Sequence, residues 1–130
     1  MEFGDGSFPL TRGQLDIWLA QESGEFDPEW HIVAFDVIKG AIEPAVLEEA
    51  IRRAVEEAEP IRAAFFEVDG QVFQRPMENP DIELPVFDLT NLDDPVHEAY
   101  RLGESIRSTP LPATGPLFKF ALFKTRPDEF

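Results

Sequence analysis

Arg62 is the residue in this sequence that most clearly requires a partner of specific chemistry. It stands in the short apolar stretch of residues 61–68, which has the composition of a core strand. A guanidinium does not deprotonate in proteins, so a buried arginine needs a carboxylate or several carbonyl partners. On a strand with an exposed face, however, Arg62 would be solvated. A buried ion pair and a solvated side chain therefore remain two open alternatives.

The other groups capable of acid–base or metal chemistry form no recognisable site. His31 and His97 belong to no metal-binding spacing such as H-x-x-x-H or H-E-x-x-H, and we expect each to be structural or solvated. Adjacent acidic pairs such as Glu48-Glu49 do not face each other on a helix and are typical of a solvated surface. No G-x-S-x-G motif and no glycine-rich phosphate loop occur. The residues alone predict no catalytic site, no metal site and no bound cofactor.

Composition narrows the class of protein. The 130 residues fit one domain at most, and 43% of them are hydrophobic, including 12 Phe, which is enough for a sizeable core. Cysteine is absent, which excludes disulfides and fits a cytoplasmic location. The formal net charge of −15 disfavours nucleic acids and anionic membranes as partners. No apolar run is long enough to span a membrane, and the first ten residues do not resemble a secretion signal.

Three helices are predicted from apolar spacing and capping residues. The clearest has apolar side chains at every third or fourth position and stops near Pro60, whose ring blocks continuation. An earlier helix begins with Thr11 and Gln14, which fit a capping box. Asp94 is a suitable N-cap for the last one. The expected helices cover residues 12–22, 44–59 and 94–107.

Extended segments are expected between these helices. Asp69-Gly70 separates two apolar runs and favours a type I′ turn, so the runs should form an antiparallel hairpin. Residues 30–38 have apolar side chains on both faces, which predicts a strand covered on one or both sides. Pro85 restricts its own segment to an edge or an unpaired stretch. The expected extended segments are residues 30–38, 61–68, 71–75, 82–89 and 117–124.

The order of these elements predicts the fold class. Helices and strands alternate without a repeat, which is typical of an α/β (α+β) sandwich in which helices cover a mixed sheet. Residues 1–7 are rich in glycine and acidic side chains, and we expect a disordered or tag-like N-terminus there. Residues 8–130 are expected to form the domain.

Five short motifs in order resemble those of nonribosomal peptide synthetase condensation domains. Residues 10–18 (LTRGQLDIW) are similar to the first core motif of that family, S-x-A-Q-x-R-L/M-W, through Gln14 and Trp18, although Gly13 replaces the usual Ala. The positions at which the first core motif, and the second one described below, depart from the family pattern are similar to those in synthetases of small siderophores. Further similar segments are residues 68–71 (VDGQ), 86–89 (VFDL) and 115–117 (GPL).

The second core motif carries Arg62. Residues 57–65 (EAEPIRAAF) resemble the pattern R-H-E-x-L-R-T-x-F through Glu59, Arg62 and Phe65. The Arg, His and Thr of that pattern are replaced by Glu57, Ala58 and Ala63. In all, the resemblance covers about residues 8–130.

The resemblance implies a fold and a role for the matching residues. The fold would be the N-terminal lobe of a chloramphenicol-acetyltransferase-like sandwich. The family's catalytic histidine lies in an H-H-x-x-x-D-G loop that would follow Phe130, so the chain is expected to hold no catalytic residue. Arg62 would pair with the aspartate of that loop, while Glu59, Gln14 and Trp18 would support the site.

The resemblance also implies a reaction and partners. The complete domain would form an amide bond between an aminoacyl or peptidyl thioester and an acceptor amine, both carried on phosphopantetheine arms of carrier domains. The chain itself would be inactive and bind no cofactor, and its exposed sheet edges favour self-association. Two alternatives stay open: part of an epimerisation or heterocyclisation domain, and a stand-alone, non-enzymatic binding module of the same fold.

Overall fold

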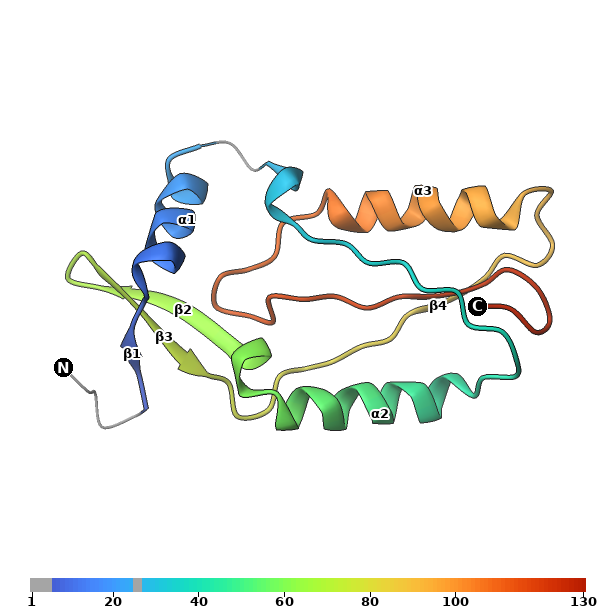
Figure 1. Ribbon diagram of the computed structural model, residues 1–130, viewed down its shortest axis with the longest axis horizontal. Coiled ribbons are helices and arrows are strands. Elements are labelled where there is room, and N and C mark those ends of the chain that lie inside the picture. Colours follow the sequence, from blue (N-terminus) through green and yellow to red (C-terminus); the bar gives the residue numbers. More distant parts are fainter. Residues whose placement is uncertain (1–5, 25–26) are drawn as a thin grey trace. The chain divides into compact units, whose positions relative to one another are not determined.

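A computed structural model describes residues 6–24 and 27–130 (Figure 1). The described chain divides into two units, each of which is assembled from separate stretches of sequence. Unit 1 comprises Met1–Asp27, Val55–Asp81 and Pro110–Phe118, and unit 2 comprises Pro28–Ala54, Ile82–Thr109 and Lys119–Phe130. The mixture of helices and sheets confirms the predicted α/β class.

Unit 1 is built on a small antiparallel sheet. Strand β3 (Gln71–Pro76) lies in the centre, with β2 (Ala63–Val68) on one side and the short β1 (Phe8–Pro9) on the other. The side chain of Phe73 on β3 is only 4% exposed and belongs to the core of this unit. Beyond β2, the Phe65 N–H donates to the Ala113 carbonyl at 2.9 Å, so a loop partly covers that edge.

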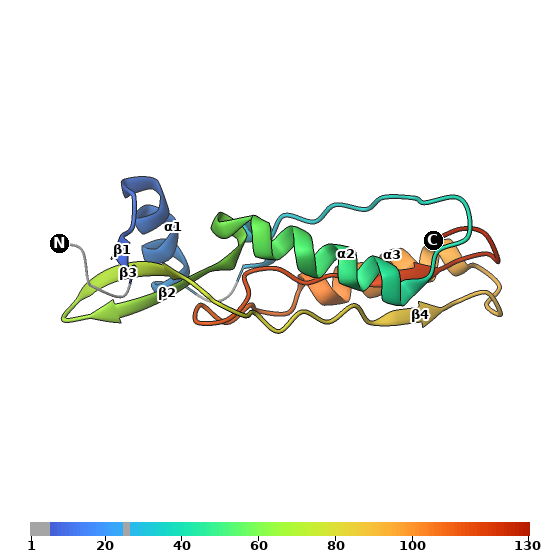
Figure 2. The same cartoon turned by 90° about the horizontal axis from the view of Figure 1, so that it is seen from below.

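The hairpin of β2 and β3 has the predicted turn. Asp69 and Gly70 have positive φ angles of 51° and 77°, as a type I′ turn requires at its two central positions. Val68 pairs with Gln71, so the turn contains only these two residues. Figure 2 shows the turn at one end of the hairpin, with the strands twisting about each other beyond it.

Helix α1 (Arg12–Glu22) begins with the predicted capping box. The Thr11 hydroxyl accepts from the Gln14 N–H at 3.3 Å, and the Gln14 side chain accepts from the Thr11 N–H at 2.9 Å. Residues 1–5 of the expected N-terminal tail, like residues 25–26 of the loop after α1, lie outside the described residues, whereas Ser7 is described and is only 1% exposed.

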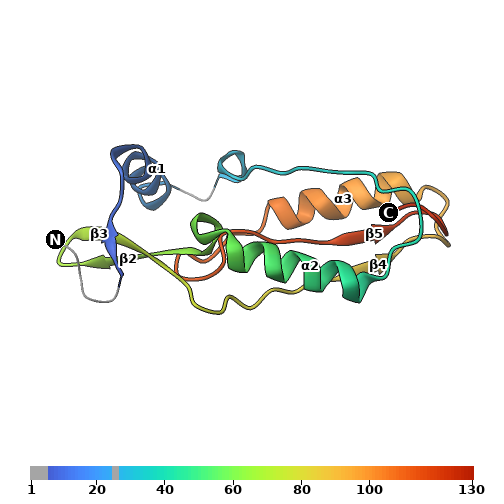
Figure 3. The ribbon, with the colours of Figure 1, turned by 60° about the horizontal axis from the view of Figure 1, so that its bottom comes forward.

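Unit 2 contains a two-stranded parallel sheet and two helices. Strand β4 (Val86–Asp88) pairs with β5 (Leu122–Lys124), and α3 (Pro95–Arg107) begins at the expected N-cap, Asp94. Helix α2 (Pro44–Glu57) lies mostly in this unit and ends two residues earlier than predicted. Strand β5 runs between α2 and α3 (Figure 3). The buried apolar side chains of the unit are Ile82, Leu84, Leu89 and Leu122.

The strand predicted for residues 30–38 is wrong. Pro28–Trp30 form a short 3-10 turn, η1, and residues 31–38 join no ladder in the described structure. Backbone pairing occurs only at the end of the segment, where Ile38 exchanges two hydrogen bonds with Phe130, at 2.7 and 2.9 Å. The apolar pattern of residues 31–38 indicates side chains that favour burial. It does not provide a partner for the backbone, and no described strand runs alongside this segment. Ile32 is 99% exposed.

Three further extended segments are shorter than predicted. Of residues 82–89, only Val86–Asp88 (β4) are paired. The apolar run after Pro60 starts with the η2 turn (Glu59–Arg62), because Pro60 fits the first position of a tight turn, so the strand begins only at Ala63. Of residues 117–124, only the last three are paired, since β4 offers a partner of only that length. Within the described residues, no helix has the length and hydropathy needed to cross a membrane.

Candidate functional site

Arg62 lies at the end of the η2 turn in unit 1 and is half-buried. Its Nη1 donates to the Met77 carbonyl at 2.7 Å, and its own carbonyl accepts from the Met77 N–H at 2.8 Å. The Nε atom is buried and has no hydrogen-bond partner among the described residues. The side chain is therefore neither solvated on a strand nor fully paired: one carbonyl holds it, and one buried donor has no acceptor.

Glu59 is the first residue of the same turn and is exposed. Within the described chain, Arg62 makes no ion pair, and the acceptor of its side-chain hydrogen bond is the Met77 carbonyl rather than the Glu59 carboxylate. The supporting role expected of Glu59 stays a prediction.

Gln14 joins α1 to the central strand of unit 1. Its amide pairs with the amide of Gln74 on β3 through two hydrogen bonds of 3.0 and 3.1 Å, one in each direction. Gln74 is only 6% exposed, so this pair satisfies a buried polar group. The same Gln14 oxygen accepts from Thr11. One side chain thus caps the helix and fixes it to the sheet.

Trp18 lies one turn further along α1. Its ring meets Phe65 of β2 edge to face, with centroids 6.0 Å apart and an interplanar angle of 77°. This is a favourable aromatic geometry. Gln14 and Trp18 therefore attach α1 to two adjacent strands, while their support of a catalytic site stays a prediction.

Gln74 and Met77 are partners that the sequence did not predict. Gln74 occupies a strand position that is otherwise expected to be apolar, and a polar residue there is a weak signal of a buried hydrogen bond. Met77 contributes only backbone atoms, N–H and C=O, to Arg62, so its side chain carries no signal at all.

The two histidines lie in unit 2 and do not form a catalytic pair there. His31 Nδ1 is 2.8 Å from the Arg107 carbonyl at the end of α3. The His97 N–H donates to the Asp94 carboxylate as part of the helix cap. Among residues 6–24 and 27–130, no group of His, Asp and Glu side chains has the arrangement of a metal site.

Two carboxylates are shifted toward the charged form. The Thr90 hydroxyl, and after it the Thr90 N–H, hold the pKa of Asp88 below its ordinary value. A hydrogen bond from Arg101 lowers the pKa of Glu98 in the same way. Asp88 is exposed and Glu98 is half-buried, and a carboxyl that stays ionised is a poor general acid. Neither carboxyl is therefore a candidate general acid, and the support of a site by the described residues stays a prediction.

Comparison with known proteins gives a family for this arrangement. The family model "Condensation domain" matches residues 5–130. The dimodular nonribosomal peptide synthase of Bacillus subtilis (strain 168) is 32% identical over 127 residues, which cover 97% of this chain and 5% of that protein. Enterobactin synthase component F of Escherichia coli (strain K12) is 30% identical over 87 residues, or 65% of this chain and 7% of that protein.

Solved structures show the same fold. The starter condensation domain of rhizomide synthetase RzmA matches 95% of this chain with a TM-score of 0.88 and 36% identity. The first condensation domain of the CDA synthetase matches the same share with a TM-score of 0.87 and 26% identity. The chain spans 30% and 33% of those two structures, so it corresponds to about a third of either one.

Proposed function

The chain belongs to the condensation-domain family of nonribosomal peptide synthetases, and we propose that it forms the N-terminal part of a domain that makes an amide bond. In the proposed reaction, an acceptor amine attacks the thioester carbonyl of a donor, a C–N bond forms and the C–S bond breaks. The amine loses a proton and the thiol of the donor arm leaves. The observation that carries the proposal is the family match over residues 5–130.

Arg62 is proposed to hold the catalytic loop in position rather than to touch substrate. A buried guanidinium N–H without an acceptor is costly, and the Arg62 Nε is such a donor among the described residues. This geometry supports a further acceptor, which we assign to the aspartate of an H-H-x-x-x-D-G loop. The 130-residue sequence does not contain that motif, so we expect no coupling by this chain alone.

The partners of the complete domain are proposed to be carrier domains and adjacent synthetase domains. Phosphopantetheine would reach the site on the carriers, and no residue of this chain is proposed to hold it. With a net charge of −15, general charge attraction would not bring an acidic carrier to this surface. Docking would therefore depend on local contacts.

A second candidate concerns the donor. The rhizomide synthetase starter domain, in a variant 36% identical to this chain, has been crystallised with C8-CoA and Leu-SNAC. This similarity favours an acyl donor over an aminoacyl or peptidyl donor, with an aminoacyl acceptor in either case. Two parallel reactions would separate these two kinds of donor. The complete domain would receive an acyl donor in one and an aminoacyl donor in the other, with the same acceptor in both.

The proposed function is tested by product analysis of the complete synthetase module with loaded carriers. We expect Arg62→Ala to abolish amide formation and Arg62→Lys to restore little of it, because a lysine lacks the planar guanidinium. Arg53→Ala, which alters an arginine that is 73% exposed, is the matched control and should keep full activity. Wild-type turnover by Arg62→Ala would overturn the assigned role. A cyclised or epimerised product would instead assign the domain to one of the sister types.

A further inference from the structure

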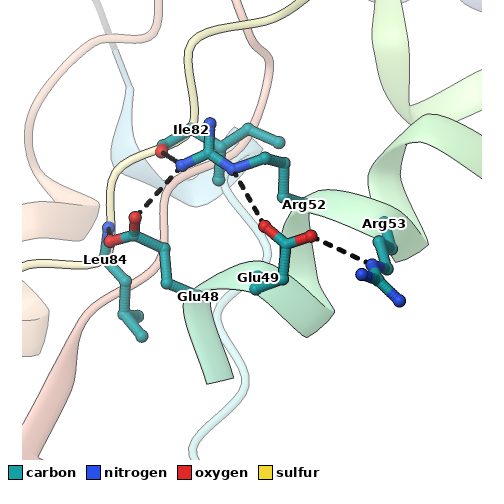
Figure 4. Close-up of polar contacts among 6 residues, drawn as sticks. All are labelled: Glu48, Glu49, Arg52, Arg53, Ile82 and Leu84. Carbon is teal, nitrogen blue, oxygen red and sulfur yellow. Dashed lines mark hydrogen bonds and ion pairs between the residues drawn. The ribbon is translucent and has the colours of Figure 1, made fainter. Parts of the chain in front are cut away.

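The Glu48 and Arg52 side chains of α2 bind the backbone of residues 82–84 in unit 2 (Figure 4). Arg52 Nη2 donates to the Ile82 carbonyl at 3.3 Å, and the Leu84 N–H donates to Glu48 Oε2 at 3.3 Å. The two side chains also pair with each other, 3.1 Å apart. One ion pair thus satisfies a backbone acceptor and a backbone donor of the same extended segment.

The two backbone groups have a specific relationship. They flank Glu83: the carbonyl belongs to the residue before it and the N–H to the residue after it. In a parallel sheet, one residue of a neighbouring strand donates its N–H and offers its carbonyl to these two groups. We infer that Glu48 and Arg52 together act as a side-chain substitute for one residue of a parallel neighbour strand, which closes this edge of the extended segment.

Glu48 and Arg52 close the edge of residues 82–84 that faces away from β5. In an extended strand, the backbone groups of successive residues point to alternate sides. The Pro85 carbonyl accepts from the Leu122 N–H of β5 at 2.9 Å, so odd-numbered residues face β5 and the groups of Ile82 and Leu84 face away from it. Burial follows the same alternation: Ile82 and Leu84 are buried, whereas Glu83 is exposed.

The Glu48–Arg52 pair protects backbone groups that would otherwise be open to another strand. Unpaired backbone groups at a sheet edge are a template for another strand, and proteins protect such edges with charged side chains. The segment before β4 joins no ladder of its own, and the Glu48–Arg52 pair fills its open side. This device depends only on residues of this chain and is independent of the proposed reaction.

Hydrogen exchange of the Leu84 amide, measured by NMR on the 130-residue chain, tests the inference. We expect Arg52→Ala to speed this exchange several-fold, and Glu48→Ala roughly tenfold, because Glu48 is the charged acceptor itself. Arg53→Ala is the matched control, since Arg53 is the next residue on the same helix and, among the described residues, pairs only with Glu49, at 3.0 Å. Equal exchange at Leu84 in the Arg52→Ala and Arg53→Ala variants would overturn the inference.

A second pair of variants separates the hydrogen bond from the charge. Glu48→Gln retains an acceptor oxygen, so it should protect the Leu84 amide better than Glu48→Ala does; equal exchange in both would contradict the acceptor role. Sedimentation velocity tests the closed edge. The double variant Glu48→Ala/Arg52→Ala should associate more strongly than Glu49→Ala/Arg53→Ala, and equal association would contradict edge closure.

Discussion

The ring of Phe35 lies where the side chain of residue 103 would be. A β-carbon built on Gly103 would come within 2.5 Å of Phe35 Cε1. Gly103 is buried in α3, and the same ring contacts Tyr100 of that helix, with centroids 4.8 Å apart. Gly103 therefore leaves the space that the Phe35 ring occupies. Phe35 itself belongs to residues 31–38, which join no ladder in the described structure.

We expect Gly103→Ala to destabilise the protein by about 1 kcal/mol, although alanine is favoured over glycine inside a helix by about the same amount. The loss comes from displacing the Phe35 ring, a typical overpacking effect. In a Phe35→Ala background, where the methyl group has room, the same substitution should stabilise by about 1 kcal/mol. Urea unfolding of the four proteins checks the change of sign; equal effects in both backgrounds would refute the contact.

The hairpin turn gives a second prediction. Gly70 has a φ of 77°, so Gly70→Ala should cost about 1–2 kcal/mol of unfolding free energy even though the added methyl meets nothing within 4 Å. Gly13→Ala is the control, because Gly13 also has open space around it but lies in α1 without a positive φ. That variant should be neutral or slightly stabilising. Thermal unfolding of both variants distinguishes backbone strain from a steric effect.

The amide pair between Gln14 and Gln74 gives a third prediction. Gln14→Ala leaves the buried Gln74 amide without its partner and should cost about 1–3 kcal/mol. Gln14→Glu keeps the acceptor for the helix cap but cannot donate to Gln74, so it should show an intermediate loss. Gln21→Ala, an exposed position of the same helix, should change the unfolding free energy by less than about 0.5 kcal/mol. If Gln21→Ala lowered the unfolding free energy as much as Gln14→Ala does, helix propensity would be responsible rather than the Gln14–Gln74 amide pair.

The lowered pKa of Asp88 gives a pH-dependent prediction. Because the hydrogen bonds from Thr90 favour the charged carboxylate, the folded-state pKa lies below the ordinary value of 3.8. The stabilisation is present above about pH 4 and is lost as the pH falls through the lower, folded-state pKa. Thr90→Val removes the hydroxyl and should raise the Asp88 pKa toward 3.8. An NMR titration of the carboxyl carbon measures this shift, and an unchanged pKa would exclude the hydroxyl as its main cause.

Exposed apolar side chains before α2 give the last prediction. Ile32 and Val37 are 99% and 67% exposed on a segment that joins no ladder, and such a segment favours association of chains. We expect the 130-residue chain to self-associate, and Ile32→Lys/Val37→Lys to reduce it. Val46→Lys is the control, since Val46 is 68% exposed on α2. A wild-type chain that sediments as a monomer at high concentration would refute the prediction.

The parts of the fold that depend on neighbouring residues could be predicted. Thr11 and Gln14 carry the whole signal of a capping box within four residues, and Asp69-Gly70 carries that of a type I′ turn. In each case the interaction joins residues close in sequence, so local chemistry determines the geometry.

Contacts between distant residues were not predictable from the same patterns. The apolar residues 30–38 indicate that burial is favoured, but not whether a strand lies beside them. Arg62 was expected within a strand that starts at residue 61, whereas it follows Pro60 in a tight turn and donates to the Met77 carbonyl. The sequence pattern does not indicate the contacts of Gln74 and Met77, because their partners, Gln14 and Arg62, are distant in the chain.

The hydrogen bonds between Ile38 and Phe130 have a consequence for synthesis on the ribosome. They join residues 92 positions apart, so this pairing in unit 2 cannot form before residue 130 has been synthesised. The apolar residues 31–38 stay without these bonds until the segment up to Phe130 has been made. Non-local pairing of this kind forms late in folding, and exposed apolar residues in its precursors promote aggregation.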